Sequence, residues 1–123
     1  DEINLIKSGK NYGWPEQQCS GNEKFENAIM CYDPSIEPGG ILYYSGDKIN
    51  LEADFVMASL RATNLYQLDF ADGLNSQKTI LSGAGRIRDV VQSPDGSLYV
   101  ITSNTDGKGF PDSMDDKLLR ILK

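Results

Sequence analysis

The fold class of this chain is decided by residues 85–103, which read GRIRDVVQSPDGSLYVITS. Two runs rich in β-branched and aromatic residues, 86–92 and 97–103, flank the Pro-Asp-Gly sequence at 94–96. An Asp-Gly pair between two strand-like runs is a strong hairpin signal, because such turns need residues that accept a positive φ. The stretch therefore predicts an antiparallel β-hairpin.

Runs of the same kind continue on both sides of this hairpin. They lie at 41–45, 54–60, 63–70, 77–82 and 116–122. Turns rich in Gly, Asp and Ser separate them, at 45–47, 72–73 and 83–85. No segment keeps a helical period. The last run could form a short helix by propensity, but its place after another strand-like run favours a strand, so we expect an all-β chain.

A weak internal repeat suggests the architecture. Residues 55–59 followed by 64–68 echo residues 98–102 followed by 117–121, and the first elements are 43 residues apart. That spacing is typical of a β-propeller blade. The sequence thus predicts a partial propeller of about two blades built from antiparallel four-stranded sheets. Because blades stabilise one another around a ring, we expect the remaining blades to be required partners.

The predicted organisation has three parts. Residues 1–39 hold a short strand at 1–6 and a long loop rich in Gly, Pro and charge. Residues 40–83 form one complete blade, and residues 84–123 supply three strands of a further blade. The chain begins with Asp1-Glu2 and no initiator Met, so we expect a piece of a longer or processed protein.

Composition excludes several classes of function. The net charge of −6 disfavours a phosphate backbone, so we expect no nucleic-acid partner. No apolar run approaches the roughly 20 residues that span a bilayer. The chain has no histidine, which removes Ser-His and Cys-His nucleophiles and most transition-metal sites. Charged residues at 24% and hydrophobic residues at 39% are typical of a chain that buries a core.

The two cysteines, Cys19 and Cys31, lie in the polar loop. They either form a disulfide, worth about 3 kcal/mol for a loop of this length, or remain free thiols in a reducing compartment. Neither lies in an apolar run that would bury it, which favours the disulfide. Their spacing does not fit a zinc site. A disulfide would imply a periplasmic or extracellular location.

Several sequence strings occur together in a characteristic order. They are DEINLI with KSGKNYGWP at 1–15, PSIEPGG at 34–40, YYSGD at 43–47, DFVMASLR at 54–61, GRIRDVVQSPDGSLYV at 85–100 and DDKLLRI at 115–121. In this order they resemble the soluble glucose/sorbosone dehydrogenases, also called aldose sugar dehydrogenases. The resemblance implies a six-bladed propeller that binds pyrroloquinoline quinone (PQQ) beside calcium and oxidises the anomeric carbon of sugars. It places the histidine base and most calcium ligands before residue 1.

Arg86 and Arg88 form the sharpest local signal. Residues two apart on a strand point to one face, so both guanidinium groups would face the channel of a propeller. Two arginine forks suit a planar tricarboxylate and could stabilise negative charge on its quinone oxygens. The resemblance gives this pair a role in cofactor contact. The alternative is a surface pair, or an Arg88 that simply pairs with Asp89.

The resemblance adds further candidates. It implies cofactor contacts for Arg61, where relatives have Lys or Arg, and for Ser35; the alternatives are ordinary turn residues. Some relatives carry an aromatic residue before the PSIEP motif, where this chain has Asp33 after Tyr32, a departure that weakens the case for stacking on PQQ.

The aromatic and acidic loops allow two interpretations each. Tyr12 and Trp14 could wall a sugar site or pack their loop onto blade edges. Asp1 and Glu2 match an acidic pair beside the family's active site but could fray as terminal residues. The oxygen-rich loop 104–116 resembles part of a calcium loop without EF-hand spacing, and a solvated turn is the favoured interpretation. No metal-ligating residue is predicted here.

The resulting functional hypothesis is a C-terminal part of a PQQ-dependent aldose sugar dehydrogenase. It would supply cationic residues to the PQQ pocket, with a sugar substrate and calcium belonging to the whole protein, and it would not be active alone. The alternative is a non-catalytic propeller of the same superfamily that serves as a binding or scaffold module. An unrelated lectin-like module explains the ordered motifs less well.

Overall fold

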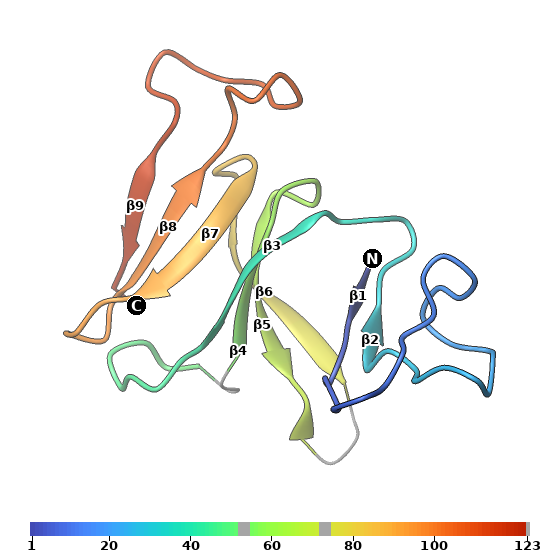
Figure 1. Cartoon of the computed structure of the whole chain (residues 1–123). Coiled ribbons are helices and arrows are strands. Elements are labelled where there is room, and N and C mark those ends of the chain that lie inside the picture. Colours follow the sequence, from blue (N-terminus) through green and yellow to red (C-terminus); the bar gives the residue numbers. More distant parts are fainter. Residues whose placement is uncertain (52–54, 72–74, 123) are drawn as a thin grey trace. The chain divides into compact units, whose positions relative to one another are not determined.

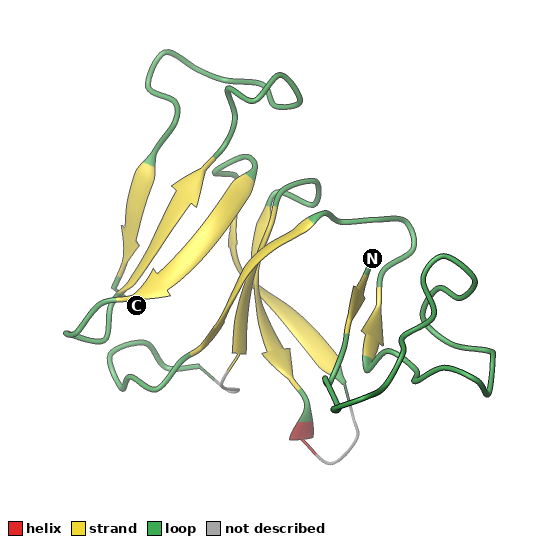
Figure 2. Ribbon diagram, viewed as in Figure 1, coloured by secondary structure: helices red, strands yellow, loops and turns green. Residues whose placement is uncertain are grey.

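The computed structural model describes residues 1–51, 55–71 and 75–122 (Figure 1). No α-helix occurs among them, and the short red segment in Figure 2 is a 3₁₀ turn. Two compact units are present, Asp1–Ile36 and Glu37–Lys123, and each is described by itself. Asp54 at the start of one predicted strand, the predicted turn at 72–73 and residue 123 lie outside the described residues. Within the described part, no helix is long and apolar enough to cross a membrane.

The first unit is a long loop tied by a two-stranded ladder and a disulfide. β1 (Glu2–Ile3) pairs antiparallel with β2 (Met30–Cys31), with Glu2 opposite Cys31. The disulfide joins Cys19 to Cys31, whose Cα atoms are 5.7 Å apart, which confirms the predicted pair. β2 was not predicted, because a two-residue strand leaves no periodicity to detect.

The first sheet of the second unit is a four-stranded antiparallel meander. Its strands are β3 (Pro38–Tyr43), β4 (Phe55–Ser59), β5 (Asn64–Asp69) and β6 (Ser76–Ser82), in the order β3-β4-β5-β6. Each strand pairs with the next in sequence, as short connections between hairpins require.

The second sheet has three strands: β7 (Ile87–Gln92), β8 (Leu98–Thr102) and β9 (Leu118–Ile121), in sequence order. The β7–β8 turn closes with Ser93 N donating to Ser97 O at 2.8 Å, and Gly96 has φ +81°. The final run is therefore a strand, as predicted, and the all-β antiparallel fold class is confirmed.

The two sheets bury one apolar layer between them. β7 packs against β3 and β4. The fully or nearly fully buried members of this layer are Tyr44, Ile49, Val56, Ala58, Leu65, Ile87, Val90, Leu98 and Val100. Gly39 permits the close approach, since a Cβ there would lie 2.2 Å from the carbonyl oxygen of Arg88.

A β-bulge interrupts β7 at Arg88. Ile87 pairs with Thr102 and Asp89 pairs with Ile101, so Arg88 is an extra residue on its strand. Bulges bend a strand and redirect side chains. Strict alternation therefore does not govern the direction of Arg88, and its position relative to Arg86 depends on the bulge.

Candidate functional site

Backbone hydrogen bonds hold Arg86 in place independently of its side-chain contacts. Gly85 has φ +85°, and a Cβ there would lie 2.2 Å from Asn104 Oδ1. The backbone N of Arg86 donates to that same oxygen at 2.7 Å, and its carbonyl accepts from Ser103 N at 2.8 Å. Only glycine satisfies both requirements at position 85.

The guanidinium group of Arg86 lies between two carboxylates. Nη2 donates to Glu37 Oε2 at 3.0 Å, and Nε donates to Asp106 Oδ2 at 3.1 Å. The side chain is only 8% exposed. Burial lowers the pKa of Arg86, but the two carboxylates outweigh burial and raise the pKa, so the group stays charged. Among the described residues, Nη1 has no hydrogen-bond partner.

The two carboxylates are correspondingly acidic. The hydrogen bond from Arg86 is the main cause that lowers the pKa of Glu37. For Asp106 the main cause is the hydrogen bond from Lys108 N at 2.9 Å, and Arg86 lowers the pKa further. Both groups are therefore ionised near neutral pH and are weak proton acceptors.

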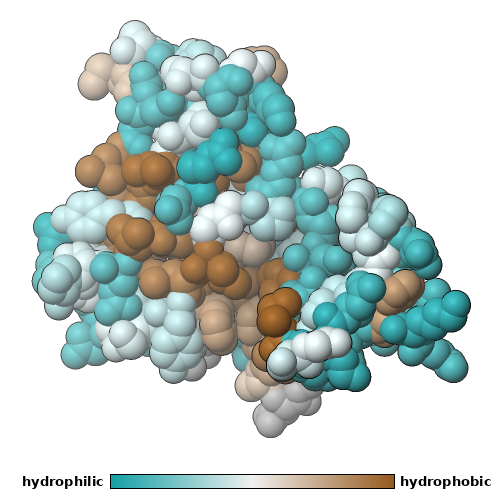
Figure 3. All heavy atoms as spheres, viewed as in Figure 1, coloured by the Kyte–Doolittle hydropathy of each residue, from teal (hydrophilic) through white to brown (hydrophobic). Residues whose placement is uncertain are grey.

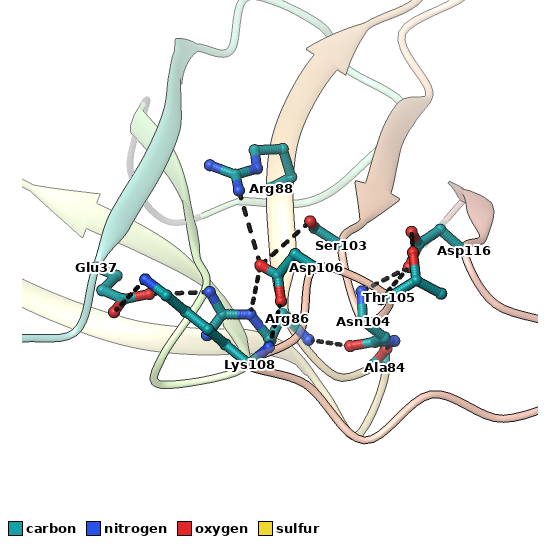
Figure 4. Close-up of polar contacts among 10 residues, drawn as sticks. All are labelled: Glu37, Ala84, Arg86, Arg88, Ser103, Asn104, Thr105, Asp106, Lys108 and Asp116. Carbon is teal, nitrogen blue, oxygen red and sulfur yellow. Dashed lines mark hydrogen bonds and ion pairs between the residues drawn. The ribbon is translucent and has the colours of Figure 1, made fainter.

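Arg88 meets Asp106 as well, but it stays accessible (Figure 4). Its Nη2 lies 3.9 Å from Asp106 Oδ2, an ion pair longer than a hydrogen bond, and its side chain is 49% exposed. Lys108 is 68% exposed, with Nζ 3.8 Å from Glu37 Oε1. The two arginines that were predicted to act together therefore converge on one carboxylate, one buried and one exposed.

We define the cationic cluster by these contacts. Its members are Glu37, Arg86, Arg88, Asp106 and Lys108. Arg61 is exposed two residues after β4 and has no ion pair with these residues, so its predicted contact with the cofactor stays a prediction. The cluster holds three cations and two carboxylates, a local positive excess on a chain whose net charge is −6.

The loop that carries Asp106 is organised by Asn104, which is 4% exposed. Its Nδ2 donates to Ala84 O at 3.2 Å and to Asp115 Oδ1 at 3.0 Å, and its backbone N donates to Asp116 Oδ1. The Asp115 side chain is 2% exposed. Most of the loop is exposed, as the interpretation as a solvated turn expects, but Asn104 and Asp115 anchor it with buried side chains. No group of three or more His, Cys, Asp or Glu in the described residues is arranged to hold a metal ion.

The remaining candidates belong to the first unit. Ser35 Oγ donates to Asp1 Oδ2 at 2.5 Å, and Ile36 N donates to the same oxygen at 3.0 Å, so Asp1 is held by its neighbours. Glu2 Oε2 accepts from Cys19 N at 3.1 Å. Their predicted proximity to a cofactor or active site stays a prediction.

The two loop aromatics differ in their surroundings. Tyr12 Oη donates to Leu5 O at 2.7 Å and accepts from Lys7 N at 2.8 Å, which ties the loop together. Trp14 is 76% exposed. Tyr32, one residue before the departure at Asp33, is buried and donates to Met30 Sδ at 3.2 Å. The structure thus gives Tyr12 a packing role and leaves Trp14 accessible.

The opposite end of the second unit has its own ion-pair centre. Asp95, in the β7–β8 turn, pairs with Lys48 Nζ at 2.9 Å and with Arg120 Nη2, and accepts from Ser97 Oγ at 2.7 Å. A polar pocket lined by residues 45–47, 92 and 94–96 opens beside it. Asp95 precedes β8 and Asp106 follows it, so the two ion-pair centres lie at opposite ends of this strand.

Sequence reasoning found the arginines but missed their partners. Glu37, Asp106 and Lys108 were not singled out, although Glu37 lies in the PSIEPGG string and Asp106 and Lys108 lie in the oxygen-rich loop. The two glycines beside Asp106 and Lys108, at 107 and 109, were the available sign of a constrained loop. A Cβ at Gly109 would lie 2.5 Å from Asn104 O.

Comparison with known proteins identifies the family and the fold. The sequence profile of the glucose/sorbosone dehydrogenase family matches residues 1–120. Aldose sugar dehydrogenase YliI from Escherichia coli is 29% identical over 125 residues, covering 88% of this chain and 34% of the relative. An uncharacterized protein from Synechocystis is 32% identical over 124 residues, covering 88% of this chain and 30% of the relative. The chain thus spans about a third of the length of these relatives.

Two solved structures share the fold. The PQQ-bound aldose sugar dehydrogenase from Streptomyces coelicolor matches with a TM-score of 0.80 and 33% identity, covering 98% of this chain and 35% of that one. A Thermus thermophilus protein assigned as an oxidoreductase (glucose dehydrogenase) matches with a TM-score of 0.80 and 36% identity, covering 98% of this chain and 36% of that one. The predicted propeller fold is confirmed, and the chain belongs to the glucose/sorbosone dehydrogenase family.

Proposed function

We propose that this chain supplies the cationic part of the PQQ pocket of a PQQ-dependent aldose sugar dehydrogenase. The observation that carries the proposal is the cationic cluster, where three cations gather around two carboxylates on an otherwise acidic chain. A PQQ-bound structural neighbour at 33% identity supports the identity of the cofactor.

The donor set fits PQQ, which is planar and carries three carboxylates. The Arg88 side chain makes no hydrogen bond to the described residues, so its N–H groups are available for a bidentate contact. Arg86 offers Nη1, and Lys108 offers an exposed ammonium group. Arg86 is buried and bound by two carboxylates, while Arg88 and Lys108 are exposed beside it. This arrangement suits an anionic ring that binds in one orientation.

The catalytic contribution of these residues is electrostatic. When bound, PQQ supplies the two-electron acceptor for oxidation of the sugar. Arg86 and Arg88 offset negative charge that develops at the cofactor end of the site. Glu37 and Asp106 have lowered pKa values and are poor proton acceptors, and the chain has no histidine. We therefore expect the proton acceptor, together with calcium, in the rest of the polypeptide and no activity from residues 1–123 alone.

The outer face of the second sheet supports a larger ring. Val91, Ile101 and Leu118 are 54%, 42% and 67% exposed, and Figure 3 shows apolar side chains gathered over β7, β8 and β9. Further propeller blades would cover this face. We assign the protein to the periplasm or the extracellular space, a location supported by the Cys19–Cys31 disulfide.

The first unit is the proposed source of sugar contacts. Trp14 is exposed and offers an apolar ring face to sugar C–H groups, whereas the Tyr12 hydroxyl is engaged within its own loop. Ser35 and Arg61 are proposed to contact the cofactor by their match to the family motifs. Alanine substitution of Trp14 should raise KM for the sugar more than it alters PQQ affinity.

The test is reconstitution of the full-length protein with PQQ and calcium. We expect a PQQ-dependent absorbance shift and dye reduction with one or more aldoses. Arg88→Gln should abolish or strongly weaken PQQ binding, whereas the matched variant Arg120→Gln, which removes an arginine paired with Asp95 at the opposite end, should not. Absence of PQQ binding by the wild-type protein would favour the non-catalytic binding module.

A further inference from the structure

We propose that Asp106 is a positioning residue that aims both arginines of the cationic cluster at the anionic cofactor, an inference that rests on the proposed function. Asp106 would not touch the cofactor itself. It would act by holding the Arg86 and Arg88 guanidinium groups in one arrangement before the cofactor arrives.

The contacts of Asp106 divide between its two oxygens. Oδ1 accepts from Lys108 N at 2.9 Å, which ties the carboxylate to its own loop. Oδ2 accepts from Arg86 Nε at 3.1 Å and from Ser103 Oγ at 3.4 Å, and lies 3.9 Å from Arg88 Nη2. One oxygen thus fixes the carboxylate, and the other orients the two cations.

The loop gives Asp106 a stable platform. Thr105 Oγ1 donates to Asp116 Oδ2 at 2.6 Å, and Asn104, immediately before it, binds the backbone of both residue 84 and residue 86. The loop that carries the carboxylate and the turn that carries Arg86 are therefore joined by hydrogen bonds. Such support is what a positioned charge requires.

If only the charge of Asp106 mattered, this carboxylate would weaken the binding of an anionic cofactor. A negative charge beside an anion-binding site weakens binding, because like charges repel across a few ångströms. Ordering a half-exposed arginine removes side-chain entropy that would otherwise be lost on binding. The two effects have opposite signs, so the affinity of an Asp106 variant separates them.

The experiment measures the PQQ dissociation constant of the full-length protein by titration of the apo form. If positioning dominates, Asp106→Asn weakens binding by about tenfold or more, although the variant is less negative. Asp95→Asn is the matched control, since it makes the same change of charge at an ion-pair centre on the opposite end of β8, and should leave the constant unchanged. Equal or tighter binding by Asp106→Asn would overturn the inference.

Two further measurements cover a variant that fails to fold and isolate the route of the effect. Asp106→Glu keeps the charge and shifts its position, so weaker binding supports positioning and wild-type affinity refutes it. In a double-mutant cycle, Asp106→Asn and Arg88→Gln together should lose less than the sum of their separate losses, because part of the effect of Asp106 passes through Arg88 and the rest through Arg86. Fully additive losses would contradict the inference. Failure of the wild-type protein to bind PQQ would instead refute the proposed function.

Discussion

The two sheets of the second unit repeat one backbone pattern but differ in what covers it. The repeat that relates residues 55–59 to 98–102 aligns Ala58 with Ile101, and their paired partners are Leu65 and Leu118. Ala58 and Leu65 are 0% exposed, whereas Ile101 and Leu118 are 42% and 67% exposed. The first pair belongs to the core between the two sheets, whereas the corresponding pair on the second sheet stays largely accessible.

This difference supports the proposal that further blades cover the exposed face of the second sheet. Strands β4 and β5 are buried at nearly every position, while β8 and β9 alternate between covered and exposed side chains. On β8 and β9 one face is buried and the other face is apolar but exposed. Exposed apolar patches of this kind mark docking surfaces.

The strongest test of the difference between the two sheets is a matched pair of leucine-to-alanine substitutions, one on each sheet. Leu65→Ala should cost about 2–5 kcal/mol of the free energy of unfolding, because it opens a cavity between the two sheets. Leu118→Ala in the 123-residue chain should change it by less than about 0.5 kcal/mol, as for other exposed positions. Urea denaturation followed by circular dichroism measures both.

The same pair becomes more informative in the full-length protein. If a further blade covers β9, Leu118→Ala should then cost about 1–3 kcal/mol, since the side chain would be buried there. A negligible cost in both contexts would contradict the proposed ring, while leaving the packing of the first sheet unaffected.

A second test addresses the contact between the sheets. Gly39→Ala should destabilise the second unit by about 1–3 kcal/mol, because its Cβ would overlap the Arg88 carbonyl oxygen and force the sheets apart. The shift should appear in the urea midpoint, and it should also weaken PQQ binding through displacement of the bulge. An unchanged midpoint would show that the close approach is not required.

Much of this fold could be predicted from local patterns. The runs from 86 to 103, the turn at 94–96 and the 43-residue repeat identify hairpins and blades, because strand periodicity and turn residues act over a few neighbours. The bulge at Arg88 could not be predicted in this way. It depends on the register against β8, which no run of residues in β7 specifies.

In the candidate site, too, local sequence patterns reveal some residues, and others depend on how the sheets pack. Arg86 and Arg88 were visible as a pair two residues apart, but their partners Glu37 and Asp106 lie 49 and 20 residues away from Arg86. Ion pairs at such separations are set by how the sheets pack, and acidic residues are common on the surface of a chain with this charge. Only the assembled sheets show which carboxylates meet the arginines.

The smallest expected effect concerns the acid stability of the link between the sheets. Glu37 precedes β3 in the first sheet and Asp106 follows β8 in the second, so Arg86 joins the two through its carboxylate contacts. Both carboxylates have pKa values below their ordinary values of 4.5 and 3.8. Their stabilising contribution is therefore complete above those ordinary values and is lost as pH falls through the lowered ones.

The measurement is the free energy of unfolding as a function of pH between about 6 and 2, for the wild type and for Glu37→Gln. The wild type should lose stability below about pH 4.5, and the variant should lose less, because one ion pair with Arg86 is already absent. The slope should not vanish, since Asp95 at the other end also has a lowered pKa and keeps its contacts with Ser97 and Lys48. Identical slopes for the two proteins would mean that Glu37 does not link the sheets electrostatically. The Asp106 end and the Asp95 end of the unit would then differ in the groups they can bind and not in their contribution to acid stability.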